Sequence, residues 1–260
     1  MKICTLKSSS RGNAILVYTD TTKILVDCGV SGKALELGLK DAGVLASDID
    51  AMVITHEHID HIKGVGVMMR RYGLSTYANH GTWLSMSDSL GKINDKNIKV
   101  FNNSDSFEIG DIGIKPFSIP HDATDPVGYS FVKGTEKLSI ATDIGELTPE
   151  MFESLRGSRA VLLEANHDVN MLEIGSYPFP LKRRIRGSLG HLSNDEAGEA
   201  AKLLTHLGTR NIILGHLSEE NNYPRLAFQT VKNILEENNI HVGKDIELTV
   251  ADACQTGCAI

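Results

Sequence analysis

One short stretch of the chain concentrates side chains that bind metal ions: Thr55-His56-Glu57-His58-Ile59-Asp60-His61. Residues two apart in an extended segment face the same way, so His56 and His58 can bind one ion. Asp60 and His61 lie where the chain turns toward a helix and can face a second ion. This density of imidazole and carboxylate exceeds what a polar surface turn needs. We therefore expect a metal site at this stretch.

A strand and a helix must position this stretch. Residues 50–54 have the length and β-branching of a buried strand, and residues 62–72 predict a helix that Asp60 opens. We expect further strands at 14–18, 23–27, 75–78, 98–101, 106–109, 112–117, 125–131, 137–143, 211–216 and 245–250, and one that begins at 159. Helices are expected at 31–42, 195–207 and 224–238, with a shorter one near residue 83. No linker and no repeat divides the chain, which indicates a single α+β domain over residues 1–260.

Composition agrees with a globular protein. Of 260 residues, 41% are hydrophobic and 23% are charged, which allows a sizeable core. No apolar run is long enough to cross a membrane, and the first residues predict a strand, so we expect a cytoplasmic protein with reduced cysteines. The net charge of −7 argues mildly against a nucleic-acid partner. Bound dications would offset part of that charge, so this class stays open.

The pattern His-x-His-x-Asp-His resembles the signature of the metallo-β-lactamase superfamily. The resemblance implies an αββα sandwich with every ligand at a strand end on one rim. It also implies three further ligands, for which His121, Asp143 and His216 stand directly after predicted strands. One ion would then be held by His56, His58 and His121, the other by Asp60, His61 and His216, with Asp143 bridging both. Imidazole with carboxylate suits Mn²⁺ or Zn²⁺, and Fe²⁺ is also compatible.

Two further motifs, Glu164-Ala165 and Gly190-His191-Leu192-Ser193, resemble tRNase Z. The resemblance implies that Glu164 orients His191, which acts as general acid or as a phosphate clamp beside the catalytic Asp60. A role for His191 in the first turn of the following helix is the structural alternative. Over nearly the whole chain, segments 12–13, 55–61, 119–122, 141–145, 164–168 and 190–194 resemble the bacterial YycJ/WalJ-type metallo-hydrolases. That branch implies a 5′-to-3′ exonuclease on double-stranded DNA, linked to mismatch repair, in which hydroxide generated by the ions attacks phosphorus.

Substrate contacts are expected from the densest basic cluster of the chain: Lys182, Arg183, Arg184 and Arg186. Cations hold a strand by its phosphates without reading its bases. The YycJ/WalJ resemblance adds Asn166 and His167, which are characteristic of that branch. The structural alternative for the basic cluster is a solvated helix face. We expect DNA as the partner, with RNA as an alternative, and no membrane partner. The sequence does not fix the oligomeric state, and a dimer is one option.

Several alternatives remain at this stage. A thioester hydrolase of the glyoxalase II kind shares the ligands, and a tRNase Z-like RNA endonuclease or a non-catalytic metal-binding module would also fit. Too few residues separate Asp143 from His216 for a β-CASP nuclease. Asp27 could hold a ligating histidine or cap the helix after it. The spacing of Cys254 and Cys258 does not favour a zinc knuckle.

Overall fold

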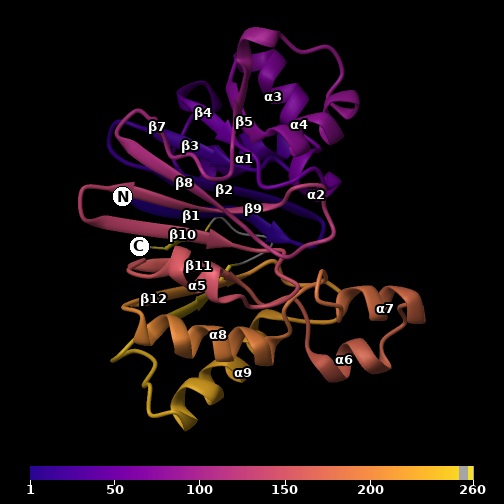
Figure 1. Ribbon diagram of the computed structural model, residues 1–260, viewed down its shortest axis with the longest axis vertical. Coiled ribbons are helices and arrows are strands. Elements are labelled where there is room, and N and C mark those ends of the chain that lie inside the picture. Colours follow the sequence, from indigo (N-terminus) through magenta and orange to yellow (C-terminus); the bar gives the residue numbers. More distant parts are fainter. Residues whose placement is uncertain (252–256, 260) are drawn as a thin grey trace.

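The structure, a computed structural model, describes residues 1–251 and 257–259. Within these residues the strands form two sheets of seven that pack face to face, with helices on both outer faces (Figure 1). These four layers are those of the predicted αββα sandwich.

The first sheet has the order β14-β1-β2-β3-β4-β5-β6. Its strands are β1 (Lys2–Ser9), β2 (Gly12–Tyr18), β3 (Lys23–Val26), β4 (Ala51–Val53), β5 (Ser75–Asn79), β6 (Ile98–Phe101) and β14 (Gly257–Ala259). Helices α1 (Gly32–Asp41), α3 (Val65–Tyr72) and α4 (His80–Met86) contribute apolar side chains to the core on its outer face. Strands β3 to β6 run parallel, so their carboxyl ends meet at one edge.

The second sheet has the order β13-β12-β11-β10-β9-β8-β7. Its strands are β7 (Phe107–Ile109), β8 (Ile112–Ser118), β9 (Val127–Lys133), β10 (Glu136–Ala141), β11 (Ala160–Glu164), β12 (Asn211–Gly215) and β13 (Glu247–Val250). Helices α5 (Pro149–Leu155), α8 (Asn194–His206) and α9 (Pro224–Glu237) cover its outer face. Strands β10 to β13 are parallel, which gives this sheet a matching edge of carboxyl ends.

The core between the sheets is apolar and tightly closed. Tyr129 and Phe131 from β9 are fully buried there against aliphatic side chains of β2 and β3. The Tyr129 hydroxyl donates to the Ile54 carbonyl of the facing sheet at 2.5 Å. A buried hydroxyl without such an acceptor would be costly, so this bond fixes the two sheets near the start of the histidine-rich turn.

Two local predictions were wrong or incomplete, and a third is not tested. The helix expected over 62–72 is divided into α2 (Ile59–Ile62) and α3. Gly64 separates them, where a Cβ atom would lie 2.4 Å from the Val30 carbonyl oxygen. Helices α5, α6 (Val169–Ile174) and α7 (Phe179–Ile185) were not predicted. The expectation that Cys254 and Cys258 do not form a zinc knuckle is not tested, because Cys254 lies outside the described residues.

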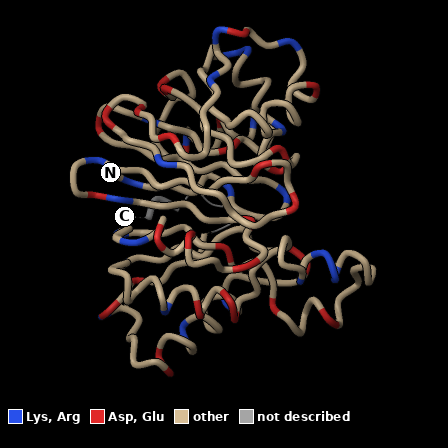
Figure 2. The backbone as a smooth tube through the Cα atoms, viewed as in Figure 1, with Lys and Arg blue, Asp and Glu red and all other residues tan. Residues whose placement is uncertain are grey.

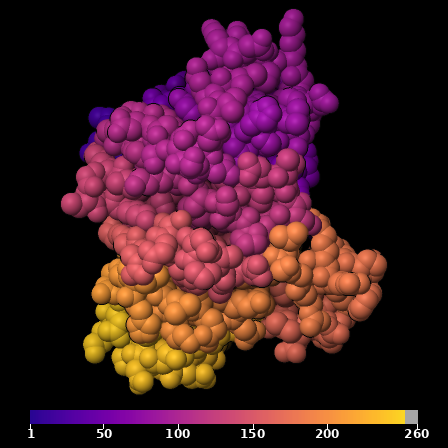
Figure 3. Space-filling model, viewed as in Figure 1, coloured from indigo at the N-terminus to yellow at the C-terminus, as the bar shows by residue number. Residues whose placement is uncertain are grey.

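Helices α6 and α7 project beside the edge of the sandwich where the strands end (Figure 3). We call residues 169–187 the α6–α7 arm. Apolar side chains on it are exposed, among them Ile174 and Phe179. The arm also carries the basic cluster, seen as the blue stretch of α7 in Figure 2. It therefore places cations next to the strand ends.

Candidate metal centre

Four chain segments bring ligand-type side chains to the shared edge of the two sheets. His56, His58, Asp60 and His61 follow β4, and Asp143 and His216 follow β10 and β12. His121 follows β8 after the bend at Pro120. The crevice outside the carboxyl ends of parallel strands is where α/β sheets commonly bind ligands.

A first cluster consists of His56, His58 and His121, whose ring nitrogens lie within 4.8 Å of one another. His58 Nδ1 and His121 Nε2 are 3.3 Å apart. His121 Nδ1 lies 3.1 Å from the Gly190 carbonyl, to which it donates, and this leaves Nε2 as the nitrogen with the lone pair. The three rings thus converge through nitrogens suited to bind one cation.

A second cluster consists of Asp60, His61 and His216. Asp60 Oδ2 lies 3.4 Å from His61 Nε2 and 3.5 Å from His216 Nε2. His61 Nδ1 donates to Asp27 Oδ2 at 2.8 Å, and the backbone N–H and hydroxyl of Thr55 also donate to the Asp27 carboxylate. Asp27 therefore holds a histidine of the cluster. Helix α1 is capped by Ser31 instead, which decides between the two roles left open for Asp27.

Asp143 stands between the clusters. Its Oδ1 lies 3.3 Å from His216 Nε2 and 3.8 Å from His121 Nε2, and its Oδ2 lies 3.4 Å from His61 Nε2. A carboxylate has two oxygens and can contact two cations at once. The geometry thus matches the predicted assignment of Asp143 to both clusters.

The electrostatic environments of the two clusters differ. Burial lowers the pKa of His56 and of His121, which favours the neutral imidazole that a metal requires. Burial also acts on His61 and His216, but nearby carboxylates outweigh it: the pKa of His61 is raised well above its usual value and that of His216 to about 10. The second cluster thus attracts positive charge.

The donor set fits divalent cations. Within the described residues, three of its buried atoms make no hydrogen bond: His56 Nε2, Asp143 Oδ2 and His216 Nε2. Buried polar atoms are nearly always satisfied, and a site of imidazole and carboxylate would be satisfied by Zn²⁺ or Mn²⁺.

Three residues at this edge adopt left-handed backbone conformations. Asp27, Asp143 and His216 have φ angles of 60°, 61° and 56°. Each comes just after a strand, and the left-handed turn directs its side chain back toward the shared edge. Such conformations cost about 1–3 kcal/mol each for residues other than glycine and cluster at functional sites.

The buried Glu164 and the partly exposed His191 form a pair beside the clusters. Glu164 Oε2 accepts from the backbone N–H groups of Ile144 and Leu192, at 2.8 and 3.1 Å. Its Oε1 lies 2.8 Å from His191 Nδ1 and also 2.8 Å from His216 Nδ1. The pKa of Glu164 is lowered despite its burial because both histidines stabilise the carboxylate. One fixed carboxylate therefore orients the candidate acid and a candidate metal ligand.

Comparison with known proteins places the chain in a family. The family pattern of the Beta-lactamase superfamily domain matches residues 22–217. Exodeoxyribonuclease YycJ of Bacillus anthracis is 40% identical over 247 residues, which cover 95% of this chain and 94% of that protein. Exodeoxyribonuclease WalJ of Streptococcus pneumoniae is 41% identical over 251 residues, which cover 95% of this chain and 93% of that protein.

This chain belongs to the YycJ/WalJ family of the metallo-β-lactamase superfamily. The predicted family, fold and enzyme class, a metal-dependent hydrolase, are thereby confirmed. Zn²⁺-bound PqqB from Methylobacterium extorquens has the same fold, with a TM-score of 0.72 at 18% identity over 98% of this chain and 99% of that chain. Human tRNase Z, short form, gives a TM-score of 0.66 at 16% identity over 98% of both chains. Within the described part of the chain, no helix has the length and apolarity needed to cross a membrane.

A cavity of about 280 Å³ opens over both clusters of this YycJ/WalJ-family member. His58, Asp60, Asp143, His191 and His216 line it, together with Arg11, Asn166 and Arg184. The side chain of His191 is 16% exposed. Because Nδ1 of His191 faces Glu164, Nε2 is left for a ligand in the cavity.

The basic cluster divides into three environments. Arg184 lines the cavity, and its guanidinium makes a two-point contact with Asp122, in which Nη2 donates to Oδ1 at 2.9 Å. Lys182 and Arg186 bond instead to Glu173 within the arm, at 2.6 Å each. The side chain of Arg183 makes no ion pair with any described residue and lines neighbouring pockets. The four cations that were predicted to hold a strand by its phosphates therefore differ in how free they are to do so, and that role stays a prediction.

The two remaining substrate-binding predictions fare differently. Asn166 lines the cavity but is buried, and its Nδ2 donates to the His216 carbonyl at 3.0 Å, so it supports the backbone of a candidate ligand. His167 is only 2% exposed and does not line the cavity. A direct contact of His167 with substrate does not agree with this position. The backbone of residue 167 forms a parallel bridge with Ser193, just before helix α8.

Sequence reasoning missed four residues at the site. Asn13 lies 3.1 Å from His61 Nε2 through its Nδ2, and Asp122 Oδ1 lies 3.5 Å from His121 Nε2. Arg11 lines the cavity and pairs with Glu219 at 3.1 Å. Asp122 follows His121 directly, so adjacency was an available signal for it. Arg11 and Asn13 reach the site through the tight turn between β1 and β2, a placement that depends on tertiary structure. Phe179 is considered below.

Proposed function

We propose that this protein is an exodeoxyribonuclease that uses two divalent metal ions to hydrolyse DNA in the 5′-to-3′ direction. The observation that carries the proposal is the pair of adjoining ligand clusters joined by Asp143 at the floor of one cavity. The names of the two relatives at 40% and 41% identity support the substrate class. A DNA substrate makes the cytoplasm the expected location.

His56, His58 and His121 would hold one ion, and Asp60, His61 and His216 the other, with Asp143 shared. When bound, two dications lower the pKa of a water toward neutrality and offset the charge that develops on the phosphate. Mn²⁺ and Zn²⁺ suit this donor set, and Fe²⁺ is also compatible.

His191 is proposed to deliver the proton that the leaving oxygen needs. Its Nδ1 is held by Glu164 Oε1 at 2.8 Å, so the ring cannot turn freely and Nε2 keeps one direction toward the cavity. A positioned acid of this kind contributes about 10²–10⁴-fold to a rate. Glu164 acts as a positioning residue because the backbone N–H groups of Ile144 and Leu192 fix it in turn.

Arg184 and Arg11 are proposed to bind phosphates on either side of the reacting one. Both line the cavity, and both are held by carboxylates, Arg184 by Asp122 and Arg11 by Glu219. Contacts to phosphate position a strand without reading its sequence, which suits a nuclease that digests from an end.

The test is hydrolysis by the metal-loaded protein of duplex DNA labelled at either the 5′ or the 3′ end. We expect Mn²⁺-dependent release of label that begins at the 5′ end, and none after chelation. A labelled tRNA precursor and S-lactoylglutathione serve as competing substrates. Preferred cleavage of the RNA, preferred hydrolysis of the thioester, or no hydrolysis with any metal would each overturn the proposal.

A further inference from the structure

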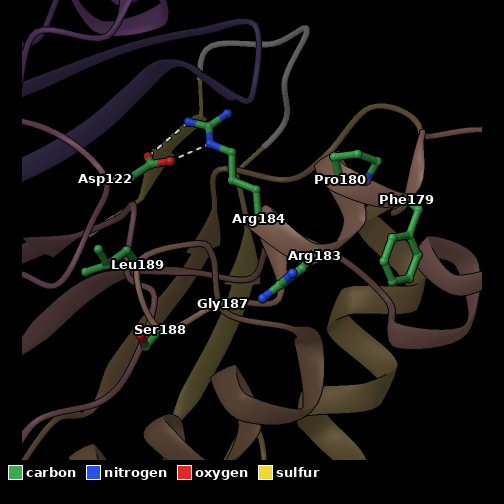
Figure 4. Close-up of a pocket in the computed structure, with 8 residues that line it drawn as sticks. All are labelled: Asp122, Phe179, Pro180, Arg183, Arg184, Gly187, Ser188 and Leu189. Atoms are coloured by element: carbon green, nitrogen blue, oxygen red, sulfur yellow. Dashed lines mark hydrogen bonds and ion pairs between the residues drawn. The ribbon is translucent and has the colours of Figure 1, made fainter.

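A second pocket adjoins the metal centre on the side of the α6–α7 arm. Phe179, Arg183, Arg184 and Leu189 line it, with Asp122 at one rim (Figure 4). Arg184 lines both this pocket and the cavity over the ligand clusters. A strand that leaves the metal centre past Arg184 therefore meets this pocket next.

The pocket combines an exposed aromatic ring, that of Phe179, with a cation, Arg183, that makes no ion pair with any described residue. Phe179 is 78% exposed and Leu189 is 51% exposed, so the lining offers apolar surface to solvent. Figure 4 shows Arg183 between the Phe179 side and the Ser188–Leu189 side, while Arg184 turns toward Asp122. Asp122 offsets the charge of Arg184 through its ion pair, and no described carboxylate pairs with Arg183. The pocket thus keeps one unpaired positive charge.

We propose that this pocket holds one nucleotide of the DNA strand, with its base on the ring of Phe179 and its phosphate on Arg183. An aromatic face stacks on any base, and a guanidinium binds phosphate through paired N–H donors. The short helix α7 sets both contacts, because Phe179 and Arg183 are four residues apart and lie on one face. This inference rests on the proposed DNA substrate and adds the groups that hold the strand outside the metal centre.

Lys182 and Arg186 are not part of this site. Both bond to Glu173 of the arm, on α6, which keeps α7 against α6. The proposal therefore separates neighbouring residues of one basic cluster into those that stabilise the arm and the one that binds the nucleotide.

The test is binding, so it does not depend on turnover. Fluorescence anisotropy would measure the affinity of a labelled single-stranded oligonucleotide, and of an abasic strand of equal length, for the full-length metal-loaded protein with His191→Ala, which should keep its metal while digestion slows. In this background, Phe179→Ala should weaken binding of the normal strand about fivefold or more and leave binding of the abasic strand unchanged. Phe179→Trp should retain binding of both strands.

Arg183→Ala should weaken binding of both strands alike and reduce the slope of log affinity against log salt by about one. Two variants outside the proposed site serve as matched controls: Leu84→Ala removes an exposed apolar side chain from α4, and Arg156→Ala removes an exposed arginine at the end of α5. Neither control should change the affinity for either strand or the salt slope.

Equal losses of both strands with Phe179→Ala, or no loss, would overturn the proposal. A change in oligomeric mass with Phe179→Ala, measured by light scattering and without an effect on DNA affinity, would overturn it in favour of contact with a second copy. If wild-type protein digests duplex DNA but Phe179→Ala binds both strands as wild type does, the proposal of a nucleotide site in this pocket is wrong. The proposed exodeoxyribonuclease function is then unaffected. If wild-type protein binds neither strand, the proposal that DNA is the substrate is itself wrong.

Discussion

The ligand clusters and the α6–α7 arm lie side by side but are built in opposite ways. In the clusters, His61 and His216 are buried, and a carboxylate from each sheet fixes them, Asp27 holding His61 and Glu164 holding His216. On the arm, Ile174 and Phe179 are 86% and 78% exposed, and local ion pairs connect its cations. The ligand clusters thus lie in a rigid frame, whereas the arm, to which we assign the holding of substrate, is a surface element that contributes little to the core.

The largest effect should come from the clusters. Asp60→Asn keeps the shape of the side chain but removes the charge that a cation needs. Hydrolysis of duplex DNA should fall by more than about 10²-fold, since even the outer shell of a metal site is worth about 10–100-fold. Steady-state kinetics and elemental analysis of the same sample measure this loss. A variant with unchanged activity and metal content would remove Asp60 from the centre.

His191→Ala should reduce kcat on DNA by about 10²–10⁴-fold without loss of metal. Bis-p-nitrophenyl phosphate sharpens the test because its leaving group needs no proton, so its hydrolysis should suffer much less. Equal losses on both substrates would argue against proton donation. A drop in metal content would show that His191 acts as a ligand.

Asp27→Asn should weaken metal binding by about 10–100-fold, because the amide can no longer accept as a carboxylate does from His61 and Thr55. Competition with a chelator of known affinity measures the change. Asp41→Asn, at the exposed end of α1, is the matched control and should bind metal as wild type does. Unaltered metal affinity in Asp27→Asn would contradict the support that we assign to it.

The smallest effect is expected on the arm. The triple variant Lys182→Ala, Arg183→Ala and Arg184→Ala should bind DNA more weakly, with a salt slope reduced by about one to two. A full reduction by three is not expected, because Lys182 is already bonded to the Glu173 carbonyl. Anisotropy titrations across a series of salt concentrations give the slope. An unchanged slope would remove the arm from the DNA interface.

The sequence predicted the strand ends that carry the candidate ligands well, because the pattern of each strand is local in the sequence. His121 and His216 each stand at the end of an apolar β-branched run, and strand ends in such sheets share an edge. The role of Asp27 could not be decided, since it depends on the pairing of β3 with β4, which brings Thr55 to it across 28 positions of the chain. Tertiary neighbours of this kind leave no local pattern.

The arm was poorly predicted for a related reason. Helices α6 and α7 are too short to show a clear helical period, although Pro180 near the start of α7 is typical of a first turn. The cluster of basic residues was recognised from the sequence. Which of them bond to Glu173, which to Asp122 and which face solvent depends on how α7 is placed in space. Which cation faces the DNA is therefore a property of the fold.

The left-handed turns at Asp27, Asp143 and His216 impose a restriction that is independent of catalysis. Among side chains other than glycine, asparagine and aspartate tolerate this backbone shape best, whereas valine, isoleucine and threonine resist it. A library that randomises these three codons and selects only for folded protein should still reject β-branched residues. A homologue that had lost its metal ions and its hydrolytic activity would therefore still need residues that tolerate a left-handed backbone at these three positions.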